Sequence, residues 1–133
     1  MTDSPPTTLR KILVVEDDPH IREVAQMALE RTGDLEVATC GKGADAYDHV
    51  REFAPDLVLL DVMMPEVDGL EVFEQLQADE TTSSVPVVLL TARAQPDELE
   101  EYHQRGVADV IVKPFDPVAL PEQVRDVWST LDP

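Results

Sequence analysis

Cysteine and long apolar segments are both scarce in this chain. Cys40 is the single cysteine among 133 residues, which excludes an internal disulfide framework and gives no support for a thiolate metal site. The longest aliphatic runs, such as residues 12–15 and 57–60, are far too short to span a bilayer. Residues 1–8 are polar and contain prolines, so they are interpreted as a flexible tail and not as a signal peptide. We therefore expect a cytoplasmic protein with no membrane partner.

Basic residues are also few. The chain has 10 Lys and Arg residues against 28 Asp and Glu residues, which gives a formal net charge of -18. A phosphate-rich partner would be repelled over most of such a surface. The sequence therefore predicts no direct contact with nucleic acid, and the acidity is interpreted mainly as a source of solubility.

The length and apolar content allow one domain. With 43% hydrophobic residues, 133 residues can enclose one ordinary core and are too few for two full domains. We expect the tail of residues 1–8 to be followed by a single domain over residues 9–133. Little chain would remain after the last helix, so no DNA-binding or enzymatic output domain is expected in it. Whether the protein is a stand-alone domain or a fragment stays open.

Aliphatic runs of strand length recur along the chain. They occupy residues 12–15, 57–60, 87–90 and 110–112, and a more mixed run covers residues 35–39. Apolar and polar residues do not alternate in them, which is typical of strands that are covered on both faces in a parallel sheet.

Segments with helical spacing separate these runs. The apolar residues that mark the five helices are Ile21, Val24, Ala25, Ala28 and Leu29; Ala46, Val50 and Phe53; Leu70, Phe73 and Leu76; Leu99 and Tyr102; Leu120, Val124, Val127 and Leu131. Asp18-Pro19 and Asp116-Pro117 supply helix N-caps followed by proline, and Asp68 with Glu71 indicates another helix start. The alternation predicts an α/β fold, a doubly wound (βα)5 parallel sheet of five strands.

Polar residues follow the expected strands at their carboxyl ends, where ligands bind in such sheets. Glu16 and Asp17 follow the first strand, and Asp61, Thr91 and Lys113 follow three others. Carboxylates at one edge repel each other, and Mg²⁺ would relieve that repulsion. An aspartate whose charge is screened can attack phosphorus as a nucleophile. The pattern therefore predicts phosphoryl-transfer chemistry.

Four fragments, in this order, resemble the receiver domain of two-component response regulators. They are Val14-Val15-Glu16-Asp17-Asp18-Pro19, the stretch from Asp61 to Gly69, Leu90-Thr91-Ala92, and Lys113-Pro114-Phe115. The resemblance covers essentially the whole chain after the tail. It implies a flavodoxin-like strand order of 2-1-3-4-5. It also implies a phosphorelay signalling domain that assists its own phosphotransfer and dephosphorylation but is not an enzyme.

The resemblance also assigns roles to individual residues. Asp61 would be the phosphoacceptor, and Thr91 and Lys113 would contact the phosphoryl group. Glu16 and Asp17 would form the acidic pair of a Mg²⁺ site that also uses Asp61 and the backbone carbonyl of Met63. Lys113-Pro114 would be a cis peptide. Lys113 itself is expected to be an exposed lysine that contributes little to packing.

The implied partners are a histidine kinase or a phosphotransfer protein as donor and a downstream protein target. That target would bind the face formed by the fourth helix, the fifth strand and the fifth helix. Thr91 would report phosphorylation by moving its hydroxyl. Val110 stands where many family members have an aromatic switch residue, so this chain departs from the family at its second switch position.

Two other classes of protein share parts of this pattern. A phosphatase of the haloacid dehalogenase type also uses an aspartate nucleophile with Mg²⁺, but it requires a second aspartate two residues after the first-strand nucleophile, where this chain has Pro19. A flavodoxin-like carrier would need a Ser/Thr/Gly-rich phosphate loop after the first strand, where this chain has acids.

Overall fold

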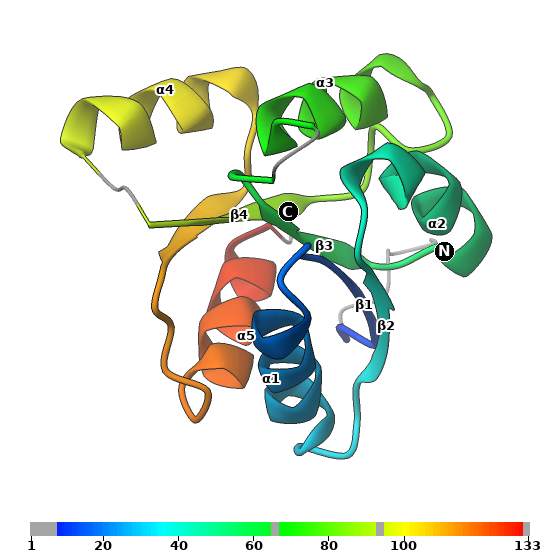
Figure 1. Ribbon diagram of the computed structural model, residues 1–133, viewed down its shortest axis with the longest axis vertical. Coiled ribbons are helices and arrows are strands. Elements are labelled where there is room, and N and C mark those ends of the chain that lie inside the picture. The colour runs from blue at the N-terminus through cyan, green and yellow to red at the C-terminus, as the bar shows by residue number, and fades with distance from the viewer. Residues whose placement is uncertain (1–7, 65–66, 93–94, 132–133) are drawn as a thin grey trace, which may run out of the picture.

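The computed structural model describes residues 8–64, 67–92 and 95–131 (Figure 1). Residues 1–7, which make up nearly all of the expected tail, lie outside this description. The strands are β1 (Lys11–Val15), β2 (Glu36–Cys40), β3 (Leu57–Asp61), β4 (Val87–Thr91) and β5 (Asp109–Val112). The helices are α1 (Pro19–Glu30), α2 (Ala46–Phe53), α3 (Gly69–Ala78), α4 (Pro96–Arg105) and α5 (Leu120–Leu131), with a 3-10 turn over Gly43–Asp45.

The five strands form one parallel sheet in the order β2-β1-β3-β4-β5. Both the doubly wound class and the strand order that the sequence predicted are confirmed. The central strand is β3, and every residue of β3 and β4 is buried. The uninterrupted aliphatic runs are explained by this position, since both faces of these strands are covered.

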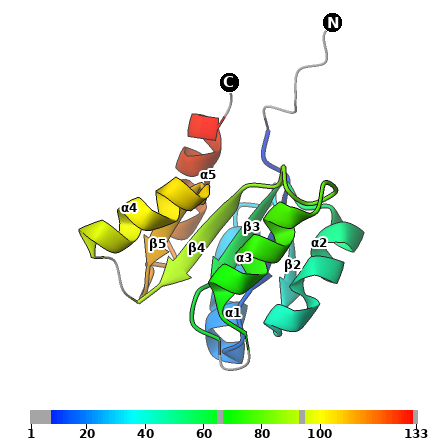
Figure 2. The same ribbon diagram turned by 90° about the horizontal axis from the view of Figure 1, so that it is seen from above.

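Helices cover the two faces of the sheet unequally. Figures 1 and 2 show α1 and α5 on one face and α2, α3 and α4 on the other. Side chains that alternate along a strand therefore enter different cores: Leu13 and Leu60 pack beneath α2, α3 and α4, whereas Ile12 and Leu59 pack beneath α1 and α5. The two cores hold the sheet from both sides, so the loops at its carboxyl edge start from fixed positions.

Most helix ends follow the sequence prediction. The Asp18 side chain caps α1 by accepting hydrogen bonds from the amides of His20 and Ile21. Asp68 caps α3 in the same way through the amide of Leu70. The cap expected at Asp116 differs, because Asp116 accepts from the Val118 amide in a turn and α5 begins only at Leu120.

Left-handed backbone marks several helix and turn positions. Gly33 and Gly106 have φ angles of 82° and 105°, as expected for glycines that end helices. Ala54 also has a positive φ, 51°, at the end of α2. The sequence did not indicate this ending, because an alanine carries no preference for left-handed backbone.

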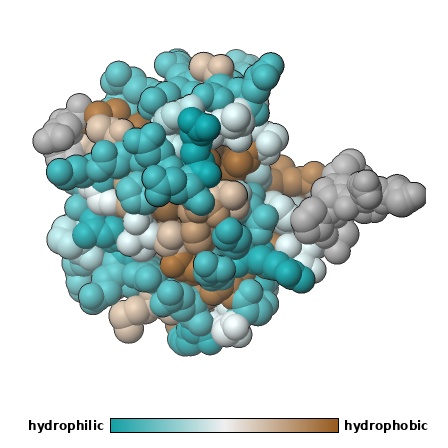
Figure 3. Space-filling model, turned by 90° about the vertical axis from the view of Figure 1, so that its right-hand side faces the viewer, coloured by the Kyte–Doolittle hydropathy of each residue, from teal (hydrophilic) through white to brown (hydrophobic). Residues whose placement is uncertain are grey.

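Hydrophilic residues cover most of the face seen in Figure 3, and hydrophobic residues appear there as patches between them. Within the described residues, no helix is both long enough and apolar enough to cross a membrane. Beneath this surface the two cores are mostly aliphatic, and Phe73 and Tyr102 add aromatic rings to the core beneath α2, α3 and α4.

Candidate functional site

The carboxyl ends of neighbouring parallel strands bring three acids together. Asp61 is the last residue of β3, and Glu16 directly follows β1, the neighbouring strand in the sheet. Both are almost fully buried, whereas Asp17 is half-buried. One carboxylate oxygen from each of Glu16, Asp17 and Asp61 lies within 4.8 Å of the others. The structure therefore places these predicted site residues in one cluster.

Lys113 reaches the same cluster from the end of β5. Its Nζ lies 2.8 Å from Glu16 Oε1 and 3.0 Å from Asp61 Oδ1. The side chain is only 17% exposed, so the expectation of an exposed lysine was wrong. The reason is that the two buried carboxylates draw the ammonium group inward, where it balances part of their charge.

Burial sets the ionisation of this group of residues. The pKa of Glu16 is raised to about 7, mainly because burial disfavours the charged carboxylate, and the hydrogen bond from Lys113 only partly opposes this. Burial would lower the pKa of Lys113, but its hydrogen bonds with Glu16 and Asp61 more than offset this and raise it. Glu16 is thus an acid poised near neutrality that a nearby cation would keep ionised.

Thr91 ends β4, between the strands that carry Asp61 and Lys113. Its side chain is buried, and its backbone carbonyl accepts a hydrogen bond of 2.8 Å from the Lys113 amide. Val110, the other expected switch residue, lies one strand further out in β5 and is half-buried. Thr91 therefore lies at the rim with the cluster, whereas Val110 lies within the sheet.

The loop between β3 and α3 folds back tightly over Asp61. The Met63 amide donates to Asp61 Oδ1 over 3.1 Å, and the Met63 side chain is exposed. The Gly69 amide donates to the Val62 carbonyl over 2.8 Å. A Cβ atom at Gly69 would lie 2.2 Å from the Asp61 carbonyl oxygen, so glycine is required where α3 meets the end of β3. Gly69 lies within the fragment that carries the resemblance, but its residue type alone does not indicate this close approach.

Arg22 was also missed from sequence. Its guanidinium Nη1 donates to the carbonyl oxygens of Glu16, at 2.9 Å, and Asp17, at 3.4 Å. The available signal was a basic residue in the first turn of α1, where the positive end of the helix dipole disfavours a cation.

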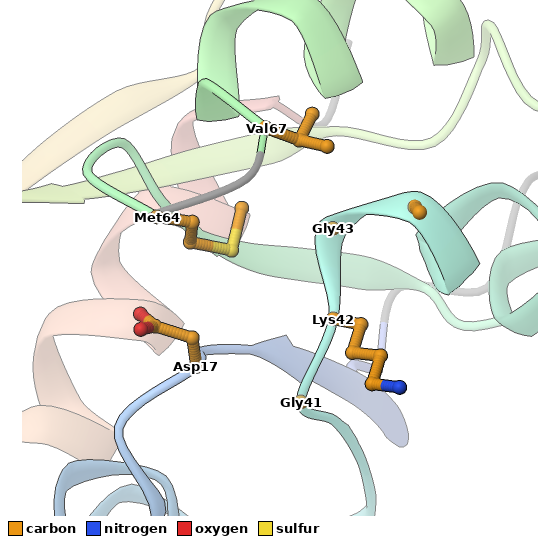
Figure 4. A pocket seen from close by; sticks show the side chains of 7 residues that line it. Asp17, Gly41, Lys42, Gly43, Met64 and Val67 are labelled. Atoms are coloured by element: carbon orange, nitrogen blue, oxygen red, sulfur yellow. The ribbon is translucent and has the colours of Figure 1, made fainter.

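The residues present fit a divalent cation. They offer hard carboxylate oxygens from three side chains, and these include the buried Glu16 with its raised pKa. A pocket lies beside Asp17 and is also lined by Met64 and, on the side across from Asp17, by Gly41 and Gly43 (Figure 4). The acidic cluster could therefore hold a metal ion with room for water next to it.

Comparison with known proteins settles the family. Residues 12–125 match the model of the response regulator receiver domain. The chain belongs to this family. It is a receiver domain of the response regulators of two-component systems, a signalling domain, and the phosphatase and flavodoxin alternatives are not favoured.

Among the receiver domain's relatives are response regulator Rre1 of Synechocystis and the DNA-binding response regulator MtrA of Mycolicibacterium smegmatis. Rre1 is 38% identical over 118 residues, which cover 89% of this chain and 51% of Rre1. MtrA is 40% identical over 119 residues, which cover 90% of this chain and 50% of MtrA. The chain thus spans about half the length of these curated relatives.

Solved structures agree on the fold of this receiver domain. The chemotaxis response regulator CheY4 of Vibrio cholerae matches with a TM-score of 0.81 at 28% identity, covering 90% of this chain and 99% of that one. The N-terminal domain of a response regulator receiver protein from Methanoculleus marisnigri matches with a TM-score of 0.72 at 36% identity, covering 90% and 97%.

These relatives correct the expected partners. We predicted a kinase or phosphotransfer protein, a protein target on the α4-β5-α5 face, and no contact with nucleic acid. MtrA and the Synechocystis regulator RpaA are DNA-binding or transcriptional regulators by name, so the exclusion of nucleic acid was wrong. The net charge of this acidic chain does not decide the question, because the chain corresponds to only half the length of these relatives.

Proposed function

We propose that this receiver domain takes a phosphoryl group onto Asp61. The supporting observation is that Asp61 is buried at the end of the central strand, with Lys113 Nζ at 3.0 Å and two further acids within reach of one ion. A carboxylate oxygen attacks phosphorus, the bond from phosphorus to the donor breaks with its electron pair leaving on the donor, and an acyl phosphate forms. The modified group belongs to the chain itself, so the domain is not an enzyme that acts on a separate substrate.

The two oxygens of Asp61 are held differently. Within the described part of the chain, the contacts from Lys113 Nζ and from the Met63 amide both fall on Oδ1. Oδ2 is therefore the better nucleophile in this proposal, because its lone pairs are less engaged by donors. Lys113 then has a second task, which is to balance the charge that the phosphoryl group brings to a buried acidic site.

The proposed cofactor is Mg²⁺, held by Glu16, Asp17, Asp61 and the backbone carbonyl of Met63. The first three offer oxygens within 4.8 Å of one another. Bound there, Mg²⁺ would screen the carboxylates and stabilise the charge on the phosphoryl oxygens. Glu16 and Asp17 would otherwise repel the entering phosphoryl group, so the chain's own acids make the reaction depend on a cation.

Thr91 and Val110 are proposed to contribute unequally to the conformational change that follows phosphorylation. Thr91 lies at the rim and hydrogen-bonds through its carbonyl to the Lys113 amide, so a shift of either residue is passed to the other. Val110 is stiff about its first side-chain torsion and cannot swing as a larger aromatic residue would. Thr91 therefore carries the larger part of the response. The proposal also includes a cytoplasmic location and a domain over residues 9–133, of which 12–125 match the family.

Asp61→Asn tests the phosphoacceptor. A small acyl phosphate with Mg²⁺ should add one phosphoryl group to the wild-type protein, and the Asn variant should gain none in an intact-mass measurement. Asp68→Asn is the matched control, because it makes the same chemical change in the adjacent loop while Asn still caps α3. Undiminished labelling of Asp61→Asn would show that the nucleophile is misassigned.

Metal removal tests the cofactor. With excess chelator the wild-type protein should stay unlabelled, and added Mg²⁺ should restore labelling, since unscreened carboxylates repel the donor. Labelling at the same rate with and without Mg²⁺ would contradict the proposed metal site.

A further inference from the structure

Arg22 touches the acidic cluster through the backbone and not through the carboxylates. Its Nη1 donates to the carbonyl oxygens of Glu16 and Asp17, the two residues of the β1–α1 loop whose side chains enter the cluster. Within the described residues, no carboxylate forms an ion pair with Arg22. The guanidinium therefore holds the loop and leaves the acid oxygens to other ligands.

This arrangement differs from that of Lys113 in a way that matters for a metal. Lys113 Nζ lies on the carboxylate oxygens of Glu16 and Asp61, where a divalent cation would also bind. A second cation on those oxygens would compete with the metal for its ligands. Arg22 instead adds positive charge near the cluster while it fixes the backbone from which two of the three acids project.

The β2–α2 loop provides the space for this guanidinium. A Cβ atom at Gly41 would lie 2.6 Å from Arg22 Nη1 and 3.2 Å from Cζ, so only a glycine leaves room there. The loop itself is anchored to the same strand end, because the Glu16 amide donates to the Cys40 carbonyl over 3.0 Å. Figure 4 shows Gly41 across the pocket from Asp17. The hydrogen bonds of Arg22 to the carbonyls of Glu16 and Asp17 place its guanidinium between Gly41 and the loop that carries these two acids.

The position of Arg22 in α1 argues against a role in the helix alone. It is the fourth residue of α1, where the positive end of the helix dipole makes a cation unfavourable. The cost is offset by the two charge-assisted hydrogen bonds to the loop.

We propose that Arg22, seated against Gly41, is a positioning residue that holds Glu16 and Asp17 in the geometry that binds Mg²⁺. This inference rests on the proposed function of the acidic cluster. Without the guanidinium, the β1–α1 loop gains freedom, and the metal must order its own ligands when it binds.

Arg22→Ala should weaken Mg²⁺ binding, measured by calorimetry, by about tenfold, the scale of one charge-assisted hydrogen bond. Phosphorylation by a small acyl phosphate should slow at low Mg²⁺ and recover most of its rate at saturating Mg²⁺, because the acids remain present. Arg31→Ala is the matched control, since it removes the same charge from an exposed position just after the other end of α1.

Gly41→Ala separates position from charge. The atoms that a methyl group would meet belong to the far end of the flexible Arg22 side chain, so the guanidinium must move while the fold is little disturbed. This variant should lose Mg²⁺ affinity to about the same extent as Arg22→Ala, and the double variant should lose little more than either, because both act on one interaction. Arg22→Lys keeps the positive charge but lacks the planar guanidinium group, so its Mg²⁺ affinity should lie between those of the wild-type protein and Arg22→Ala.

Amide hydrogen exchange without metal adds a readout that does not need activity. Faster exchange at residues 16–18 in Arg22→Ala and Gly41→Ala, but not in Arg31→Ala, would support the proposal. Mg²⁺ affinities of Gly41→Ala and Arg22→Lys equal to that of Arg31→Ala would overturn it, even if Arg22→Ala failed to fold. A wild-type protein that neither binds Mg²⁺ nor is phosphorylated would instead overturn the proposed function itself.

Discussion

Asp56 supports the sheet from the edge opposite the acidic cluster. Its Oδ2 accepts hydrogen bonds from the backbone amides of Arg10, at 3.0 Å, and Lys11, at 2.9 Å. Its own amide donates to the Lys11 carbonyl over 2.8 Å. A single residue before β3 therefore fixes the start of β1, and with it the register that places Glu16 beside Asp61 at the other edge.

Asp56→Ala should lower the free energy of unfolding by about 2 kcal/mol, because one exposed and one partly buried amide lose a charged acceptor. Asp56→Asn keeps a neutral acceptor and should lose about half as much. Urea denaturation in metal-free buffer measures both. Equal midpoints for Asp56→Ala and wild type would show that water replaces this carboxylate without cost.

The carboxylate of Asp79 carries a pH dependence. It accepts hydrogen bonds from the Tyr47 hydroxyl and from the amide and hydroxyl of Thr81, and the Tyr47 bond contributes most to lowering its pKa from 3.8 to about 2. A carboxyl with a depressed pKa stabilises the folded state above its unfolded pKa, and this contribution is lost as the pH falls toward the folded pKa. The contribution of this bond should therefore fade between about pH 4 and pH 2.

Tyr47→Phe removes only the hydroxyl and keeps the ring that Arg51 contacts. The variant should be less stable than wild type at pH 6, and the difference should shrink at pH 3.5, because Asp79 of the unfolded chain, with its ordinary pKa, takes up a proton before Asp79 of the folded protein does. Urea midpoints at the two pH values give the comparison. A difference that grows on acidification would mean that the tyrosine stabilises the protonated carboxyl.

At the scale of elements, α4 is the helix that packs least deeply. Tyr102 is its only buried residue. Arg105 adds surface ion pairs to Glu74 in α3 and Glu101 in α4, each with its charged atoms about 3 Å apart, and such exposed pairs contribute little. The loop that leads from Thr91 into α4 includes residues 93–94, which lie outside the described residues. A helix held by one aromatic side chain is a good candidate for a population shift.

Amide hydrogen exchange with and without beryllofluoride, a phosphoryl mimic, should change mainly between Thr91 and Gly106. The reason is that Thr91 starts this stretch at the rim, and α4 follows it with few buried contacts. Helix α1, which buries Ala25, Ala28 and Leu29, serves as the internal reference. A response in α1 with none between Thr91 and Gly106 would show that the switch runs through another element.

Most elements could be predicted from sequence because the aliphatic runs are continuous and the helical spacing is regular. The runs at 12–15 and 87–90 each became a strand within one residue of its predicted bounds. The start of α5 was predicted too early, because the aspartate and proline of Asp116-Pro117 suit a turn as well as a helix start, and here they form a turn before Leu120. The left-handed Ala54 could not be predicted, because alanine has no preference for this conformation. Local patterns specify an element better than they specify its ends.

The sequence predicted which residues form the candidate site, because they follow strand ends, but it did not predict how deeply these residues are buried. Strand ends brought Glu16, Asp61 and Lys113 together, whereas the burial of Lys113 came from side-chain contacts that no pattern shows. Arg22 and Gly41 were missed because their contact joins a helix side chain to a loop 19 residues further along the chain. Their pairing depends on the Arg22 guanidinium passing close to the Gly41 backbone, which only the folded chain reveals.

For the molecule as a whole, repulsion between acidic residues should lower the free energy of unfolding, and added salt should reduce this repulsion. The net charge is -18, and the few described ion pairs leave most of the 28 acids without a basic partner nearby. Like charges spread over a small surface destabilise the compact state, and salt screens them within about 10 Å at 0.1 M.

Raising NaCl from 20 mM to 300 mM at pH 7.5 should raise Tm by about 4 °C or more, the shift that about 1 kcal/mol produces in a small domain. The same addition near pH 4.2, the sequence pI, should change Tm much less because the net charge is then close to zero. Differential scanning calorimetry at both pH values provides the test. An equal effect at the two pH values would point to ion binding or to hydrophobic salting-out instead of screening.

Gly69 takes no part in any chemical step, yet its position is as restricted as that of Asp61. A Cβ atom at position 69 would lie 2.2 Å from the Asp61 carbonyl oxygen and 2.7 Å from the Val62 Cα. These are backbone atoms at the end of the central strand, and they cannot move to make room for a side chain. In a saturation mutagenesis library selected for signalling, the codons for Asp61 and Gly69 should both remain almost unchanged. One would be retained for the oxygen atoms it supplies and the other for the volume it leaves empty. Tolerance to substitution therefore maps the space around the aspartate as well as the aspartate itself.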